Sequence, residues 1–217
     1  MNELIFLLHS ISVVLFALIA LRLGKSALIV MVALQGVLAN IFVVKQVSLF
    51  GFAVTCSDVF SIGGILSLNL LQEYFGKEAA KGAIKISLLV LLFFACMSQI
   101  HLLYVPSALD STHSSFTAIF ASTPRIIFAS IATFYLVQSM DVRIFPYLRG
   151  KLPIRVGISL FISQLVDTVL FSFLGLYGLV ESLFDIIFMS FLIKGLIITI
   201  SSPFLAFSKR VVKHVPL

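Results

Sequence analysis

The chain has 217 residues, of which 60% are hydrophobic and 11% are charged. Soluble proteins average roughly 45–50% apolar and about 25% charged residues, so this composition is typical of a membrane protein and argues against an ordinary soluble enzyme. The formal net charge is +6, a surplus that would suggest nucleic-acid binding in a soluble domain. Cys56 and Cys96 both lie in apolar runs and predict neither a disulfide nor a zinc site.

Apolar runs near the roughly 20 residues that a helix needs to cross a bilayer recur along the whole chain. The expected spans are residues 4–21, 27–45, 49–72, 84–106, 116–140, 154–178 and 182–207. The predicted fold is therefore an all-α, polytopic transmembrane bundle of about seven helices, with residues 1–217 as a single transmembrane domain. No small-residue cleavage site follows the first run, so we expect a retained helix rather than a removed signal peptide.

Basic residues alternate between the connections of this seven-helix arrangement, as expected when cytoplasmic loops are enriched in Lys and Arg. Twelve fall on one side: Arg22, Lys25, Lys77, Lys81, Lys85, Arg143, Arg149, Lys151, Arg155, Lys209, Arg210 and Lys213. Lys45 falls on the other side. The alternation predicts an integral inner-membrane protein with its N-terminus outside and its C-terminus in the cytoplasm. It also explains the basic surplus as a topology signal, without nucleic acid as a partner.

Four charged residues lie inside the expected spans, namely Asp58, Arg125, Asp167 and Lys194. At about 1.5 Å per helical residue, all four fall roughly 14–18 Å from the outer surface. Each charge costs about 2.5–3.5 kcal/mol at that depth, so we expect the four to pair with one another. They are either ion pairs that lock the bundle or the lining of a polar cavity. We favour the cavity, because apolar replacements often stabilise as well as buried ion pairs.

Neutral polar residues in the spans are candidates for hydrogen bonds to these charges. Gln164 lies one turn before Asp167, Thr168 follows Asp167, and Asn40 lies in the second span. Asp185, three residues into the last span, is equally compatible with this layer and with the outer interface. Gly63 and Gly64 favour close helix packing over a local break in the third span.

Motifs of catalysis and ATP hydrolysis are absent from the sequence. It contains no GxxxxGK[ST], HExxH or GxSxG motif, and the four histidines lack the spacing of a metal site. We therefore predict a transporter of a small polar solute, with no catalytic residue, cofactor or metal. One alternative is a solute-binding membrane subunit energised by a separate ATPase. A less favoured alternative is an intramembrane enzyme that uses Asp58 and Asp167 as paired carboxylates.

The order of these residues resembles the queuosine precursor transporter family, also grouped as vitamin uptake transporters. The pattern comprises Arg125, the segment from Gln138 through Asp141 and Arg143 to Phe145, the segment Ser163-Gln164-Leu-Val-Asp167-Thr168 with Phe171, then Asp185 and Lys194. The stretch from Asn40 to Lys45 and the pair Glu73 and Gly76 extend it. One departure is Asn69, which stands where the family motif has Asp, with the extra acid Asp58 about three turns earlier.

The resemblance implies a six-helix core preceded by an extra N-terminal helix. It also implies uptake of a 7-deazaguanine base (queuine, preQ1 or preQ0) for salvage into a tRNA modification. A carboxylate can accept the N1–H and the exocyclic amine of such a base as paired hydrogen bonds, a role for Asp167 or Asp58. Expected partners are this small base and the lipid bilayer, and self-association stays open. The expected substrate-binding residues are Asp167, Gln164, Arg125, Lys194, Asp58, Asn40, Thr168 and Asp185.

Overall fold

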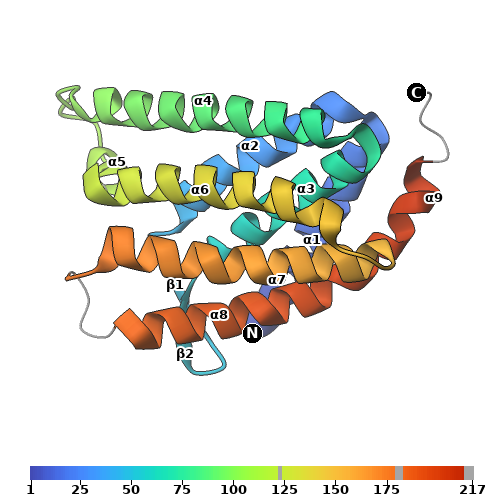
Figure 1. The fold of residues 1–217 in the computed structure, drawn as a ribbon. Coiled ribbons are helices and arrows are strands. Elements are labelled where there is room, and N and C mark those ends of the chain that lie inside the picture. The colour runs from blue at the N-terminus through green and yellow to red at the C-terminus, as the bar shows by residue number, and fades with distance from the viewer. Residues whose placement is uncertain (122–123, 179–182, 213–217) are drawn as a thin grey trace.

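The computed structural model describes residues 1–121, 124–178 and 183–212, which form a bundle of long helices (Figure 1). The helices of 18 residues or more in this part are α1 (Asn2–Leu23), α2 (Lys25–Phe42), α3 (Asp58–Phe75), α4 (Lys77–Leu102), α6 (Pro124–Ile144), α7 (Leu152–Phe171) and α8 (Leu183–Ser201). Five of them, α1, α2, α4, α7 and α8, are long and apolar enough to cross a membrane. The prediction of an all-α polytopic membrane bundle is thereby confirmed.

Two sharp reversals between helices occur at glycines. Gly24 separates α1 from α2, and Gly76 separates α3 from α4, with φ angles of 104° and 86°. Glycine adopts such angles without the steric cost that a Cβ would add. Each reversal takes a single residue. As a result α1 runs antiparallel to α2, and α3 runs antiparallel to α4 (Figure 1).

Helix α3 lies at the centre of the bundle. It contacts α1, α2, α4, α6, α7 and α8, and most of its length is buried. Figure 1 shows α4, α6, α7 and α8 side by side, with α1, α2 and α3 behind them. A Cβ at Gly63 would collide with Gln35 of α2 and Val13 of α1, which confirms close helix packing at this glycine.

The third expected span, 49–72, is not helical throughout. Strands β1 (Gln46–Leu49) and β2 (Phe52–Thr55) form an antiparallel hairpin in which Leu49 pairs with Phe52, and α3 begins only at Asp58. Phe50 and Gly51 at the tip have φ angles of 52° and 85°, as a tight two-residue hairpin turn requires. The expectation was wrong here because hydropathy alone does not distinguish an apolar hairpin from a helix.

The fifth expected span, 116–140, is also not one helix. A short helix α5 (His113–Phe120) precedes α6, which begins at Pro124. Proline lacks the N–H that a helix interior needs but is well suited to the first helical turn. The break therefore moves Arg125 from the expected middle of a helix to its first turn.

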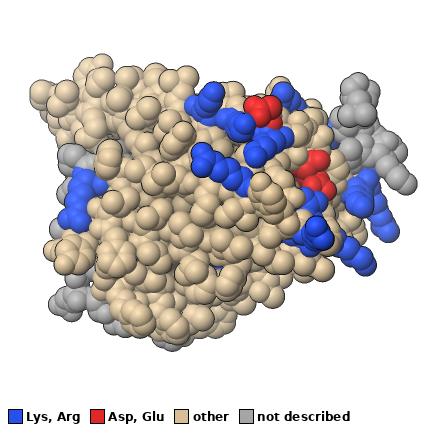
Figure 2. Space-filling model, viewed as in Figure 1, with Lys and Arg blue, Asp and Glu red and all other residues tan. Residues whose placement is uncertain are grey.

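The remaining short elements follow the long helices or connect them. They are the 3-10 turns η1 (Phe145–Tyr147) and η3 (Ser202–Phe207), the π-helical turn η2 (Ser172–Leu176) and helix α9 (Ser208–Val212). Figure 2 shows most of the visible Lys and Arg at the end of the bundle that carries α9. Some of these basic side chains reach towards the middle of the bundle, and the helical surface between them and the opposite end is uncharged in this view, as a lipid-facing surface requires.

Candidate functional site

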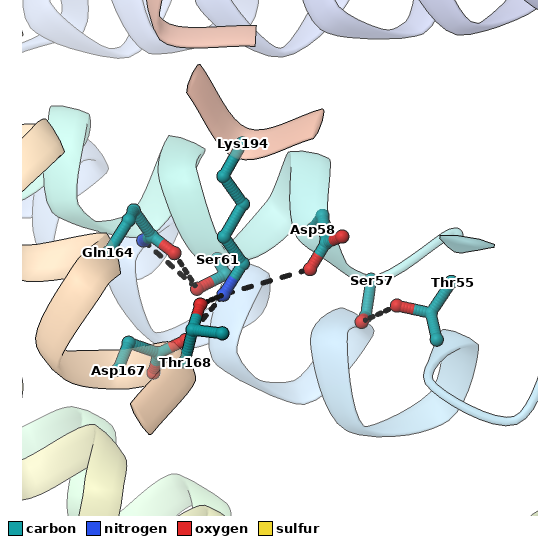
Figure 3. A network of polar contacts seen from close by, with 8 residues as sticks. All are labelled: Thr55, Ser57, Asp58, Ser61, Gln164, Asp167, Thr168 and Lys194. Carbon is teal, nitrogen blue, oxygen red and sulfur yellow. Dashed lines mark hydrogen bonds and ion pairs between the residues drawn. The ribbon is translucent and has the colours of Figure 1, made fainter. Parts of the chain in front are cut away.

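Lys194 of α8 is the centre of a buried polar cluster (Figure 3). Its Nζ donates hydrogen bonds to Oδ2 of Asp167 at 2.7 Å and to Oγ1 of Thr168 at 3.0 Å, both on α7. Oδ1 of Asp58, on α3, lies 3.8 Å from the same Nζ. The Lys194 side chain is only 5% exposed. Three of the four charges expected inside the membrane are thus in contact.

Local structure explains why these three helices supply the charges. Asp58 is the first residue of α3, where the positive end of the helix dipole stabilises a carboxylate. Asp167 and Thr168 are consecutive on α7, so one ammonium group with three donors reaches both. One lysine against two aspartates leaves the cluster with a formal net charge of −1.

Gln164 extends the cluster along α7. Its Nε2 lies 3.1 Å from Oγ of Ser61, and its Oε1 lies 3.3 Å from the same hydroxyl. Gln164 is completely buried. Ser61 was predicted neither as a charge partner nor as a binding residue. Its spacing of three residues from Asp58, which places both on one face of α3, was the signal that could have identified it.

Arg125 does not belong to this cluster, and the expectation that it lies deep inside a span was wrong. It is the second residue of α6, its side chain is exposed, and its Nε donates to the carbonyl oxygen of Leu174 at 2.8 Å. Leu174 lies in η2, so Arg125 joins the start of α6 to the π-helical turn that follows α7. The proline at the start of α6 is the physical reason for this position.

Asn40 and Asp185 are also not joined to Lys194 by any described contact. Oδ1 of Asn40 accepts a hydrogen bond from Ser130 at 2.7 Å, and its Nδ2 donates to the Gly36 carbonyl. Asn40 lines a separate cavity of about 40 Å³ between α2, α4, α5 and α6. Asp185 lies in the first turn of α8, and its side chain is outside the part of the chain that the structure describes.

A second buried carboxylate, Asp141 of α6, was absent from the predicted site. Ser159 and Ser163 of α7 both donate hydrogen bonds to its Oδ1, the latter at 2.7 Å. Asp141 is completely buried. The expected span ended at residue 140, so Asp141 was counted as a residue just outside the membrane. In the structure α6 continues to Ile144, which places Asp141 inside the helix.

The arrangement as a whole is that of a membrane transporter. Ionisable side chains inside a helical bundle are costly and mark the pathways of polar solutes or ions. The sequence profile of the family described as "Putative vitamin uptake transporter" matches residues 55–208, and this chain belongs to that family.

A relative of known description gives the comparison a second basis. The "Probable queuosine precursor transporter" of Bacillus subtilis (strain 168) is 30% identical to this chain over 200 residues. The match covers 88% of this chain and 87% of the relative. No solved structure matches the chain. The protein is therefore an integral membrane transporter, as its composition and the charges inside its apolar runs together predicted.

Proposed function

We propose that the protein imports a queuosine precursor, a 7-deazaguanine base such as queuine, preQ1 or preQ0. The observation that carries the proposal is the buried cluster of Lys194, Asp58 and Asp167 in a chain that is similar to a described queuosine precursor transporter. The N-terminus lies outside and the C-terminus in the cytoplasm, in accord with the basic residues at the α9 end of the bundle.

The chemistry of the cluster suits a deazaguanine ring. The ring presents an N1–H and an exocyclic amine side by side, and a carboxylate accepts both in one bidentate contact. Asp58 is the better placed carboxylate for this role, because Asp167 already accepts the short 2.7 Å bond from Lys194 while Asp58 lies at 3.8 Å. The ring carbonyl needs a donor, which the Gln164 amide or the Lys194 ammonium supplies.

Asp58, Gln164 and Lys194 are all buried in this conformation, while the Asp167 side chain is 22% exposed. A ring that contacts all four residues therefore requires α3, α7 and α8 to move apart. Such movement around a binding site near the membrane midplane is the principle of alternating access. Thr168 has a supporting role, because its hydroxyl holds the Lys194 ammonium in place.

Uptake of radiolabelled queuine, preQ1 and preQ0 tests the proposal in a host that lacks its own importer and its own synthesis. We expect uptake with the wild-type chain and the appearance of queuosine in tRNA. Asp58→Asn and Asp167→Asn should each lower uptake by about ten-fold or more, because a hydrogen bond to a charged group contributes about 1.5–3 kcal/mol. All variants are compared at equal membrane abundance.

Asp110→Asn is the matched control, because it makes the same chemical change in an exposed connection. It should transport as the wild type does. Wild-type chain that is abundant in the membrane but carries none of the three bases would refute the proposed substrate class. Undiminished uptake in Asp58→Asn and Asp167→Asn would refute the proposed site.

A further inference from the structure

The carboxylate of Asp141 combines complete burial with incomplete hydrogen bonding. Ser159 and Ser163 both donate to its Oδ1, while Oδ2 is buried without a hydrogen-bond partner among the described residues. The side chain of Asn69, on α3, faces this carboxylate. Both polar atoms of Asn69 are likewise buried and unpartnered in the described part of the chain. The site thus combines a buried carboxylate oxygen with a nearby buried amide, and neither has a hydrogen-bond partner among the described residues.

The titratable side chains on the surrounding elements are engaged or exposed elsewhere. Arg155 of α7 donates to both carboxylate oxygens of Glu73 of α3, and its guanidinium lies 4.6 Å from the centre of the Phe145 ring. Tyr74 contacts Ser208, Lys81 pairs with Glu78, and Asp167 and Asp58 face Lys194. The exposed ones are Lys77, Lys85 and His101 of α4, Cys96 of α4, Arg125, Tyr135 and Arg143 of α6, and Tyr147 of η1.

Within the described ranges, Asp141 thus has no cation to balance a negative charge. An unpaired buried carboxylate is strongly destabilising, and such a group relieves the cost by binding a proton. The site can satisfy both forms. The two serine hydroxyls donate to the ionised carboxylate, and the nearby Asn69 amide carries both a donor and an acceptor, so it suits either form of the acid. Because the site stabilises both the ionised and the protonated carboxyl group, Asp141 can bind and release a proton reversibly.

The Asp141 site is physically linked to the proposed substrate cluster through α7. Ser163, which contacts Asp141, is adjacent in sequence to Gln164, which contacts Ser61. On α3, Asn69 lies 11 residues after Asp58, roughly 16 Å further along the helix. A change of protonation at Asp141 alters the α6–α7 contact, and the same helix α7 carries half of the substrate cluster. The two binding events can therefore bias one conformational equilibrium.

We propose that Asp141 is the proton-binding site through which the transporter couples solute uptake to inward proton flow. In each cycle a proton from outside binds Oδ2 of Asp141 and leaves to the cytoplasm, which restores the carboxylate. The inference rests on the proposed import function, since a coupled solute is required. Asp141 carries the proton, whereas Ser159, Ser163 and Asn69 position it.

The test uses the purified full-length chain in liposomes, with radiolabelled queuine, preQ1 and preQ0 each as a probe. Two activities are measured: exchange of labelled for unlabelled base without any gradient, and accumulation driven by an inward pH gradient. We expect the wild type to perform both. Asp141→Asn keeps the shape of the side chain but cannot bind or release a proton. It should retain exchange, while the accumulation of base should fall by about ten-fold or more.

Ser163→Ala tests the proton-binding role through the pH profile of accumulation, which would not shift if Asp141 were only structural. Loss of one hydroxyl donor disfavours the ionised carboxylate, so accumulation should persist with its pH profile shifted to more alkaline pH. Asp110→Asn, in an exposed connection, should match the wild type in both activities and in its profile. If Asp141→Asn loses both activities, a shifted Ser163→Ala profile still supports the proposal, and an unshifted one overturns it.

The remaining outcomes separate this inference from the proposed function. Wild-type chain that exchanges none of the three bases refutes the import function, and the coupling proposal with it. Wild-type chain that exchanges a base but accumulates it only with a sodium gradient, or with no response to pH, leaves import intact and overturns proton coupling. Accumulation by Asp141→Asn at the wild-type level overturns the assignment to Asp141.

Discussion

At the scale of single residues, Lys194 is the side chain on which the buried cluster depends. Its ammonium is the one cation in contact with both Asp58 and Asp167 among the described residues. Buried carboxylates that lose their cation retain the full cost of desolvation. The lysine therefore has two roles, as a proposed substrate donor and as the counter-ion that allows α3, α7 and α8 to pack.

Replacement Lys194→Met tests the counter-ion role. We expect the free energy of unfolding to fall by about 3–5 kcal/mol, because the change leaves the buried Asp58 and the partly buried Asp167 without their cation. The measurement is thermal unfolding of the purified protein in detergent. Adding Asp58→Asn and Asp167→Asn to Lys194→Met should recover part of the loss, since no buried charge then remains.

The control for this experiment is Lys151→Met, because Lys151 is exposed in the connection before α7. It should unfold at the wild-type temperature. A Lys194→Met protein as stable as the wild type would show that the cluster contributes nothing to folding. The roles of Asp58 and Asp167 would then have to be explained by transport alone.

The residues of the cluster were only partly predictable. The mutual pairing of Asp58, Asp167 and Lys194 followed from the desolvation cost of isolated charges, which depends on residue type and depth alone. Arg125 was misplaced because its depth was counted through a helix that the structure divides before Pro124. Asp141 was missed because its importance depends on facing Ser159 and Ser163 of another helix.

At the scale of elements, the β1–β2 hairpin decides where α3 begins and hence where Asp58 lies. The N-terminus of α1 holds the hairpin in place. Nδ2 of Asn2 donates to the Ser48 carbonyl at 3.1 Å, and the Phe50 backbone N–H donates to Glu3 at 3.3 Å. The first helix thus contributes to the site indirectly, by fixing the segment that precedes Asp58.

The hairpin tip offers a prediction about backbone strain. Phe50 has a φ of 52°, a left-handed conformation that costs a residue with a Cβ about 1–2 kcal/mol. Phe50→Asn creates the Asn-Gly pair that two-residue turns prefer. We expect it to raise the free energy of unfolding by about 1 kcal/mol, measured by thermal unfolding in detergent.

Gly51→Ala is the opposing control, because Gly51 has a φ of 85° and a Cβ is strained there whatever the space. It should lower the unfolding temperature. If Phe50→Asn destabilises the protein and Gly51→Ala does not, the turn does not adopt the described conformation in the folded protein.

At the scale of the whole molecule, the charges divide the bundle into two unlike ends. Most of the visible Lys and Arg gather on the half of the bundle that carries α9 (Figure 2), and the helical surface of the other half is largely uncharged in this view. This distribution supports the proposed orientation, since positive residues are retained on the cytoplasmic side. The proposed proton site, Asp141, lies near the C-terminal end of α6.

Cysteine labelling tests the orientation in intact cells. In a Cys56→Ser, Cys96→Ser background, Ser111→Cys lies in the exposed connection between α4 and α5, and Lys151→Cys lies in the exposed connection between α6 and α7. A membrane-impermeant maleimide should label Ser111→Cys in intact cells and Lys151→Cys only after permeabilisation. The reverse pattern would show that the N-terminus is cytoplasmic.

The sequence by itself determined that this chain crosses a membrane as a bundle of long helices and that charges inside the bundle must pair. Both conclusions follow from run length and from the cost of desolvating a charge, which are properties of single segments and residues. The tertiary structure alone decided that Asp58 begins α3, that Arg125 lies at the start of α6, and that Asp141 faces two serines of α7. Those positions depend on where helices end and on which faces meet, and packing between segments distant in sequence sets both.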